Sequence, residues 1–152
     1  MYKELGNSHW QHKYMEYVIK QRNTNNKPII VETLDPSSSS LNYATHKIDG
    51  FNDEAIDKLK NQYDLVFLPD CGGPWFTDFL NLHKVPIPLI KLVLNIVKKE
   101  GFLYASKLYN SDAYSIAKKL LLDEGYKTDT EYAMFDTEKQ SGTNYLIIEQ
   151  NK

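Results

Sequence analysis

The residues best suited to chemistry follow a short apolar run that ends at Pro69. Asp70, Cys71, Gly72 and Gly73 come directly after it. An apolar run of this length predicts a buried strand, and open α/β sheets bind their ligands at the carboxyl ends of such strands. The Asp70 carboxylate could then accept a hydrogen bond or a proton from a ligand, and the glycines would let the ligand approach the backbone. A purely structural role is the alternative, since Asp is a common turn former.

The neighbours of Asp70 limit that chemistry. A carboxylate beside the Cys71 thiol argues against a thiolate nucleophile, because it disfavours negative charge on the sulfur. Trp75 and Phe76 follow within the same loop, where they could stack on a planar group such as a base. Aromatic side chains in this position also seal a sheet edge, so the sequence leaves both roles open.

Acidic residues also accompany two earlier strand candidates. Glu32 and Asp35 lie at the end of an apolar run that begins after Pro28, and Asp49 follows a weaker candidate at residues 43–48. Acidic side chains at strand ends accept hydrogen bonds from a ribose diol in dinucleotide-binding domains. Turn formation explains the same residues equally well.

No metal site or disulfide is expected. His9 and His12 have a spacing that suits two ligands on one helix, but no third ligand lies nearby in the sequence. Cys71 is the single cysteine, which excludes an internal disulfide and a cysteine zinc cluster. We therefore expect a reducing, intracellular and cytoplasmic location.

Length and composition are those of one ordinary globular domain, expected over residues 1–152. The 152 residues are 41% hydrophobic and 25% charged, with a formal net charge of -2. This charge argues against a dedicated nucleic-acid binder, although a local basic groove stays compatible with it. Every apolar run falls short of the roughly 20 residues that span a membrane, so we expect no membrane partner.

Alternating strand and helix patterns predict an α/β fold. We expect helices at residues 8–22, 52–59, 86–100 and 111–124, and buried strands at 28–34, 64–69 and 102–108. Strands that are apolar on both faces belong to a parallel sheet covered by helices. The last two strand patterns, at 127–135 and 144–149, have no helix between them and predict an antiparallel hairpin. The expected architecture is a three-layer α/β fold with a mostly parallel sheet and this hairpin at its C-terminal end.

From about residue 50 onward, the order of elements resembles the class I, Rossmann-like methyltransferases that depend on S-adenosylmethionine. Segments 63–70, 97–104, 123–126 and 144–149 carry the resemblance. It implies that the strand before Asp70 ends at the active-site lip and that the hairpin supplies a reversed last strand. It also implies S-adenosylmethionine, or a related nucleoside-type small molecule, as the ligand. The implied ligand contacts are Asp70, Cys71 and Gly72 at the lip, with Glu32, Asp35 and Asp49 as further contacts.

Lys107 extends the resemblance to the ribose 2′-O methyltransferases. In that family an Asp and a Lys on neighbouring strand ends help to deprotonate a ribose hydroxyl, and here Asp70 and Lys107 follow consecutive strand patterns. Residues 73–76 are similar in part to the acidic-Pro-Pro-aromatic signature of amino methyltransferases. The resemblance thus implies a nucleic-acid acceptor, at ribose or base, with Asp70 and Lys107 as catalytic residues. Asn144 lies about where the first family has a Glu, and a solvated strand-end lysine is the alternative for Lys107.

The first half departs from the methyltransferase pattern. Those enzymes hold their cofactor with a Gly-rich loop after the first strand, because only Gly lets the backbone come close enough. No such loop follows the strand candidate at 28–34. The chain is therefore interpreted either as a reduced methyltransferase-like domain or as a catalytically inactive one that binds or scaffolds a protein or RNA partner.

Overall fold

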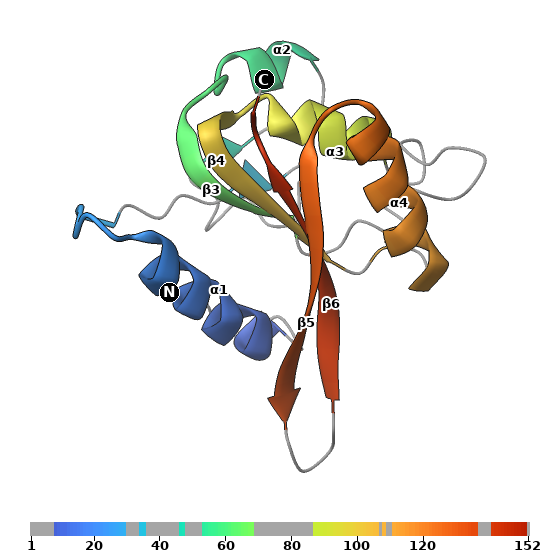
Figure 1. Ribbon diagram of the computed structural model, residues 1–152. Helices are drawn as coiled ribbons and strands as arrows, with labels where there is room; N and C mark the ends of the chain where they lie inside the picture. Colours follow the sequence, from blue (N-terminus) through green and yellow to red (C-terminus); the bar gives the residue numbers. More distant parts are fainter. Residues whose placement is uncertain are drawn as a thin grey trace.

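The computed structural model describes residues 8–29, 34–35, 46–47, 53–68, 87–106, 108, 111–136 and 141–151. Its helices are α1 (Ser8–Arg22), α2 (Asp53–Asp57), α3 (Ile87–Leu94) and α4 (Ser111–Asp123). Its strands are β1 (Leu34–Asp35), β2 (His46–Lys47), β3 (Tyr63–Leu68), β4 (Val97–Ser106), β5 (Lys127–Asp136) and β6 (Ser141–Glu149). The elements form a mixed α/β fold with a twisted central sheet (Figure 1).

The central sheet has the strand order β3-β4-β6-β5. β3 pairs in parallel with β4, whereas β6 runs antiparallel to both β4 and β5. The expected C-terminal hairpin is confirmed, and its second strand lies between β4 and β5. The mostly parallel sheet is not confirmed, because within this four-stranded sheet β3–β4 is the one parallel pair. The reversed β6 is the reason, since it separates two strands that point the same way.

The strand predicted at residues 28–34 is wrong where its first residues are described. Pro28 and Ile29 belong to no strand, and the Ile29 side chain is 59% exposed. The Asn23 side chain accepts a hydrogen bond from the Lys27 N–H and donates one to the Lys27 carbonyl oxygen. This turn, with Asn26 at a φ of 51°, ends just before Pro28 and sets the chain direction there.

The prediction of a single sheet is also wrong. β1 and β2 pair with each other in parallel, with Leu34 opposite His46, and form a separate two-stranded sheet. The apolar run after Pro28 predicted a central strand because β-branched residues favour strands. Strand propensity does not specify which sheet a strand joins, since pairing partners lie far away in the sequence.

The helix predicted at 86–100 is shorter than expected, because its last part belongs to β4. α3 ends at Leu94, and the Ile96 carbonyl oxygen accepts hydrogen bonds from the N–H groups of Gln62 and Tyr63, which lead into β3. Val97 is fully buried as the first residue of β4. Its spacing from the apolar residues of α3 fits a helix equally well, so periodicity placed the boundary too late.

β4 contains an irregularity near its start that depends on a glycine. Its register with β3 shifts between Tyr63 and Leu65, and Glu100 has a φ of 71° in the same stretch. A Cβ atom on Gly101 would lie 2.6 Å from the Asp64 carbonyl oxygen. The two strands can therefore approach this closely only with Gly at position 101.

Alternate residues of the sheet face two separate cores. One face packs against α3 and α4, with α2 nearby, and its core includes Ile56, Leu68, Leu89, Ile90, Val93, Leu94, Leu103, Ala117, Leu121, Leu146 and Ile148. The other face packs against α1, and its core consists of Tyr14, Val18, Tyr104, Ala133, Tyr145 and Ile147. Figure 1 shows α1 on the opposite side of the sheet from α3 and α4. Together they form three layers, as expected for strands that are apolar on both faces.

The helices predicted at 8–22 and 111–124 are confirmed as α1 and α4. α4 ends at Asp123, and Gly125 follows two residues later with a φ of 93°. The Gly125 N–H donates to the Leu122 carbonyl oxygen and the Tyr126 N–H to the Leu121 carbonyl oxygen. This helix ending requires a residue in the left-handed region, which Gly adopts without strain.

β5 and β6 continue beyond β4 as a two-stranded arm (Figure 1). The last residue of β4, Ser106, pairs with Tyr145, whereas β6 begins earlier at Ser141. On the arm, Tyr132 is 52% exposed. Its ring lies over Gly142, where an added Cβ would be 2.7 Å from the ring carbon Cζ. An aromatic ring over a glycine shields the backbone that the missing side chain leaves bare.

β5 is the outer strand of the four-stranded sheet. The Thr130 N–H donates a hydrogen bond to the Asp129 Oδ1 atom at 2.8 Å. The same oxygen lies 3.8 Å from the Lys118 Nζ atom of α4. One backbone donor of the outer strand is thus occupied by a side chain.

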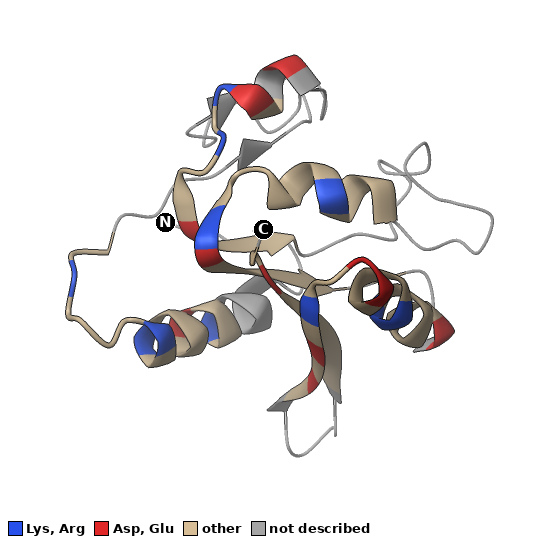
Figure 2. Ribbon diagram, turned by 45° about the horizontal axis from the view of Figure 1, so that its top comes forward, with Lys and Arg blue, Asp and Glu red and all other residues tan. Residues whose placement is uncertain are grey.

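Charged residues of both signs are spread over the described surface (Figure 2). Two of the ion pairs are Lys91–Glu124 at 3.1 Å and Lys127–Glu149 at 3.9 Å. Exposed pairs of this kind contribute little to stability. None of the helices in the described part of the chain is long and apolar enough to cross a membrane.

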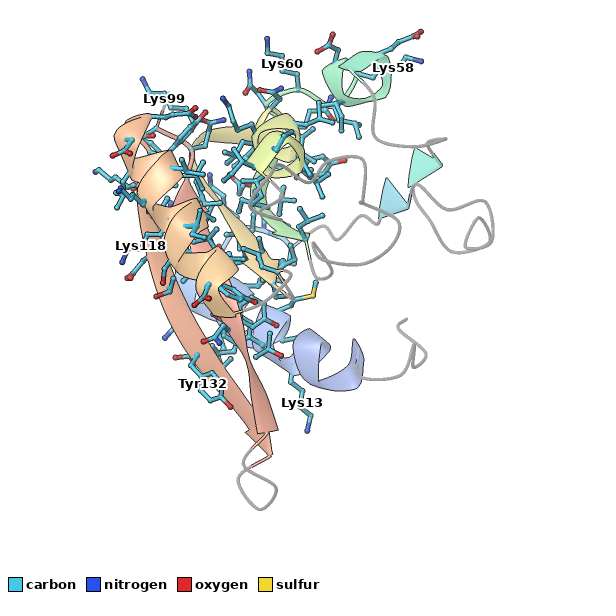
Figure 3. All side chains as sticks on the ribbon, turned by 90° about the vertical axis from the view of Figure 1, so that its right-hand side faces the viewer. Lys13, Lys58, Lys60, Lys99, Lys118 and Tyr132 are labelled. Carbon is cyan, nitrogen blue, oxygen red and sulfur yellow. The ribbon has the colours of Figure 1, made fainter. Side chains whose placement is uncertain are left out.

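We expect Gly101→Ala to destabilise the fold by about 1–3 kcal/mol, the range for overpacking a close contact. The new methyl group would meet the carbonyl oxygens of Asp64 and Lys98 at 2.6 and 2.9 Å, and backbone atoms cannot move aside as a flexible side chain can. Urea unfolding measures the effect. Lys99→Ala is the matched control, because Lys99 is exposed in the same stretch and points away from the sheet (Figure 3). Equal unfolding midpoints for Gly101→Ala and Lys99→Ala would contradict the close approach.

Candidate functional site

The candidate site is the edge at which β3 and β4 end side by side. Their register pairs Leu68, the last residue of β3, with Ala105 near the end of β4. β6 arrives at the same edge from the opposite direction, and its Tyr145 pairs with Ser106. Open α/β sheets bind their ligands at the carboxyl ends of parallel strands. The described strands therefore end together at the edge for which the sequence predicts a ligand site.

Most of the predicted site residues lie outside the described residues. These are Glu32, Asp49, Asp70, Cys71, Gly72, Gly73, Trp75, Phe76 and Lys107. Asp35 is the last residue of β1, where it pairs with Lys47 of β2. Asn144 is an exposed residue of β6, opposite Tyr132 of β5. The structure thus brings together the strand ends that flank Asp70 and Lys107, and the roles of these two residues stay predictions.

Tyr114, in the first turn of α4, joins two parts of this edge. Its hydroxyl oxygen accepts a hydrogen bond from the Leu108 N–H at 3.3 Å, and its O–H donates to the Asn144 carbonyl oxygen at 3.0 Å. Leu108 is 6% exposed and Ser106 is fully buried. The chain is therefore buried at the end of β4 and at Leu108, and a side chain of α4 bonds to the Leu108 backbone.

Sequence reasoning did not identify Tyr114. The sequence contains one signal that could have identified this residue, namely the short distance between the end of β4 at Ser106 and the start of α4 at Ser111. The first turn of such a helix lies against the strand that precedes it, so a long polar side chain there can reach the backbone at the strand end. Its partner at Asn144 is 30 residues away, and no local pattern indicates that contact.

On the opposite face of the sheet, Arg22 fixes the C-terminal end of α1. Its guanidinium carbon lies 3.6 Å from the centroid of the Phe102 ring. Its Nε and Nη2 atoms donate hydrogen bonds to the Tyr104 hydroxyl oxygen at 3.1 and 2.9 Å. The Tyr104 ring in turn stacks on Phe67 at 5.2 Å between centroids. A cation over an aromatic ring together with charged hydrogen bonds anchors α1 on the middle of β4.

Burial raises the pKa values of three tyrosines where α1 packs on the sheet, Tyr14 of α1 and Tyr104 and Tyr145 of the sheet. Burial raises the pKa of Tyr145 to about 12 and also raises the pKa of Tyr14, to which the nearby Glu131 carboxylate adds. Burial raises the pKa of Tyr104 as well, although the hydrogen bond and the charge of Arg22 act in the opposite direction. The three rings belong to the core that packs α1 against the sheet.

The remaining described features contribute no ligand group to the candidate site. No three His, Cys, Asp or Glu side chains of the described residues lie close enough together to hold a metal ion. A groove is lined by Glu16, Ile19, Lys20, Asn23, Asn26 and Ile29. It lies on the outer side of α1, whereas Tyr14 and Val18 of the same helix face the sheet.

Comparison with known proteins gives a distant structural likeness. No family model matches the chain, and no curated protein matches it. Among solved structures, the chain is similar to the precorrin-6y C5,15-methyltransferase of Geobacter metallireducens, with 21% sequence identity and a TM-score of 0.43. The match covers 72% of this chain and 55% of that chain, so this chain spans about half the length of that protein. A likeness of this degree concerns the course of the backbone and transfers neither an activity nor site residues.

The free energy of unfolding should fall at alkaline pH, and we expect Tyr145→Phe to lose less of it than the wild type does. Burial raises the pKa of Tyr145 from 10.0 to about 12, so the folded chain holds the phenol proton more tightly than the unfolded chain does. This contribution is fully present below pH 10 and is lost as the pH rises through 12, by up to about 2–3 kcal/mol. Urea unfolding at pH 8 and pH 11 measures it.

At pH 8 the same substitution should be neutral or stabilising, because the Tyr145 hydroxyl is buried without a hydrogen-bond partner in the described part of the chain. Tyr17→Phe is the matched control, since the Tyr17 side chain is 52% exposed. The pKa assignment is wrong if wild type and Tyr145→Phe lose the same stability between the two pH values.

Proposed function

We propose that this chain is a reduced methyltransferase-like domain that binds S-adenosylmethionine, or a related nucleoside, at the carboxyl edge of β3 and β4. The observation that carries the proposal is the place of β6, a reversed last strand inserted between β4 and β5. A reversed last strand is what the resemblance to class I methyltransferases implies. β3, parallel to β4, is the strand whose end leads to Asp70.

Equal spacing supports a pairing of Asp70 with Lys107. Leu68 and Ala105 are register partners, and each is followed two positions later by one member of the pair. Parallel strands that keep their register bring such positions to the same level of the sheet. In the proposal, Asp70 and Lys107 bind and deprotonate the acceptor group, which fits a ribose hydroxyl or a base of a nucleic acid.

The proposed cofactor contacts are Asp70, Cys71 and Gly72 at the strand end, with Glu32, Asp35 and Asp49 nearby as ribose acceptors. The described frame fits a nucleoside in two respects. The parallel ends of β3 and β4 form the edge where such ligands bind, and Tyr114 links the chain after β4 to β6 at this edge. S-adenosylmethionine would supply the methyl group that is transferred.

A catalytically inactive binding or scaffolding domain is the second candidate. It is favoured by the separate β1–β2 sheet, because β3 then forms the edge of the four-stranded sheet in the described residues. The sequence also has no Gly-rich loop after its first strand. In a nucleotide-binding α/β sheet that loop belongs to a strand beside the ligand cleft. This candidate replaces the cofactor with a protein or RNA partner.

Calorimetric titration with S-adenosylhomocysteine and S-adenosylmethionine separates the two candidates. We expect the wild type to bind both ligands. Asp70→Ala should bind them with an affinity at least about tenfold lower, because a hydrogen bond to a charged group contributes about 1.5–3 kcal/mol. Where methyl transfer to RNA is measured, Asp70→Ala should lower the rate about 100-fold or more, as for other positioned acids and bases.

The matched control is Asp64→Ala, at the opposite end of β3, where the carboxylate is 77% exposed and lies 3.7 Å from Lys98 Nζ. It should bind both ligands as the wild type does. Thermal melts accompany the titration, because a carboxylate that only caps the loop would cost about 0.5–2 kcal/mol of stability instead. Absence of binding by the wild type at millimolar ligand would leave the scaffold candidate.

A further inference from the structure

Positive charge is concentrated on α1 and on the chain that directly follows it. Between residues 8 and 29 the sequence has one carboxylate, Glu16, and four cationic side chains, at Lys13, Lys20, Arg22 and Lys27. The whole chain nevertheless has a net charge of -2, so the rest of it carries an excess of acidic groups. Figure 2 shows the basic positions along α1 and beyond its end. A negatively charged ligand is therefore attracted to α1 and repelled by the remainder of the chain.

The outward face of α1 places an aromatic ring between two of these lysines. Tyr17 lies four residues after Lys13 and three before Lys20, so the three side chains share one face of the helix. All three are exposed, and the Tyr17 side chain is 52% exposed. The opposite face, with Tyr14 and Val18, packs on the sheet. Alternating aromatic and cationic side chains suit a single-stranded nucleic acid, because its bases stack on rings and its phosphates pair with cations.

The Tyr17 ring is held from two sides. Its hydroxyl oxygen accepts a hydrogen bond from the Gln21 Nε2 atom at 2.7 Å. Its centroid lies 6.3 Å from that of the Tyr14 ring, and Tyr14 is itself stacked on Tyr145 of β6 at 4.2 Å. A ring that is already fixed in the free protein loses little conformational entropy when a base stacks on it.

We propose that the outward face of α1 binds a single-stranded nucleic acid, with a base stacked on Tyr17 and phosphates bound by Lys13 and Lys20. The groove next to Lys20 has a volume of about 430 Å³, and its lining includes Ile19, Ile29 and Glu16. Apolar side chains beside a carboxylate suit a further base or sugar and disfavour a phosphate. The phosphates are therefore directed to the lysines and the bases to Tyr17 and the groove.

The Tyr17 ring favours this ligand over two other anionic ones. An acidic peptide would satisfy the lysines but has no planar group for the ring. A duplex has the same phosphates, but its bases are already stacked on one another. The inference is independent of the proposed function, because S-adenosylmethionine takes no part in this binding.

The test measures binding of a fluorescently labelled single-stranded RNA of about 12 nucleotides to the full chain by anisotropy, without cofactor. We expect the wild type to bind with a Kd on the order of 10 μM. Tyr17→Ala should weaken binding about fivefold or more, as for other stacking residues. Tyr132→Ala is the matched control and should bind as the wild type does, because Tyr132 is also 52% exposed but lies on the arm, beside Glu131.

Salt titration tests the lysines. For single strands, each phosphate contact contributes about -0.7 to the slope of log affinity against log salt concentration. Lys20→Gln should therefore reduce the magnitude of the slope by about 0.7. Lys99→Gln makes the same change in net charge at an exposed position of β4, and it should leave the slope as in the wild type. Thermal melts verify that each variant is folded at the temperature of the measurement.

Four results would overturn the inference: no binding of RNA by the wild type up to about 0.1 mM, equal affinities of Tyr17→Ala and Tyr132→Ala, equal slopes for Lys20→Gln and Lys99→Gln, or a duplex bound as tightly as the single strand. Displacement of the RNA by oligoglutamate at equal charge concentration would also overturn it, since an acidic peptide would then suffice. Titration with S-adenosylhomocysteine decides the proposed function separately. A wild type that binds RNA but not S-adenosylhomocysteine supports this inference and contradicts the proposed function, and the reverse result does the opposite.

Discussion

The fold depends on β6, because it hydrogen-bonds to a strand on each side and separates two cores. Its pairing with β4 and with β5 makes one sheet from elements that would otherwise be a β-α-β unit and a free hairpin. Leu146 and Ile148 are fully buried towards α3 and α4, while Tyr145 and Ile147 pack under α1. A shift of one residue in this strand would exchange the aliphatic and aromatic faces. The position of every helix that covers the sheet therefore follows from the register of β6.

The same strand explains why α1 can belong to the domain at all. α1 is separated from β3 by a long stretch of sequence, and its attachment is made by few residues. Tyr14 stacks on Tyr145 at 4.2 Å between ring centroids, and Arg22 covers Phe102. Aromatic stacking and cation–π contacts each contribute on the order of 1 kcal/mol. Helix α1 is thus held by specific ring contacts at its middle and its end, whereas α3 and α4 are held by aliphatic packing.

Sequence patterns predicted those elements whose signals are local. α4 and the hairpin follow from the Gly125 helix ending and from the absence of a helix between the last two strands. The wrong predictions at Ile29 and Val97 arise because their signals are not local. The residues around each of them are compatible with more than one secondary structure. Which one forms depends on contacts with distant segments, and the periodicity of apolar residues carries no information about those contacts. The edge of the candidate site was predictable from strand order, but the role of Tyr114 was not, because it bonds to backbone groups of Leu108 and of the distant Asn144.

The side chain of Asp129 on β5 has a consequence for how this protein behaves in a crowded solution. An unpaired outer strand is a template on which a second chain can add, and continued addition produces fibrils. At Thr130 the backbone N–H already has the Asp129 carboxylate as its acceptor, and an incoming strand would meet that negative charge. Antiparallel pairing of two copies about Thr130 would place Asp129 of one opposite Glu131 of the other, and like charges at such a position destabilise the pair. Two carboxylates and one hydrogen bond of the outer strand therefore oppose the addition of a second chain.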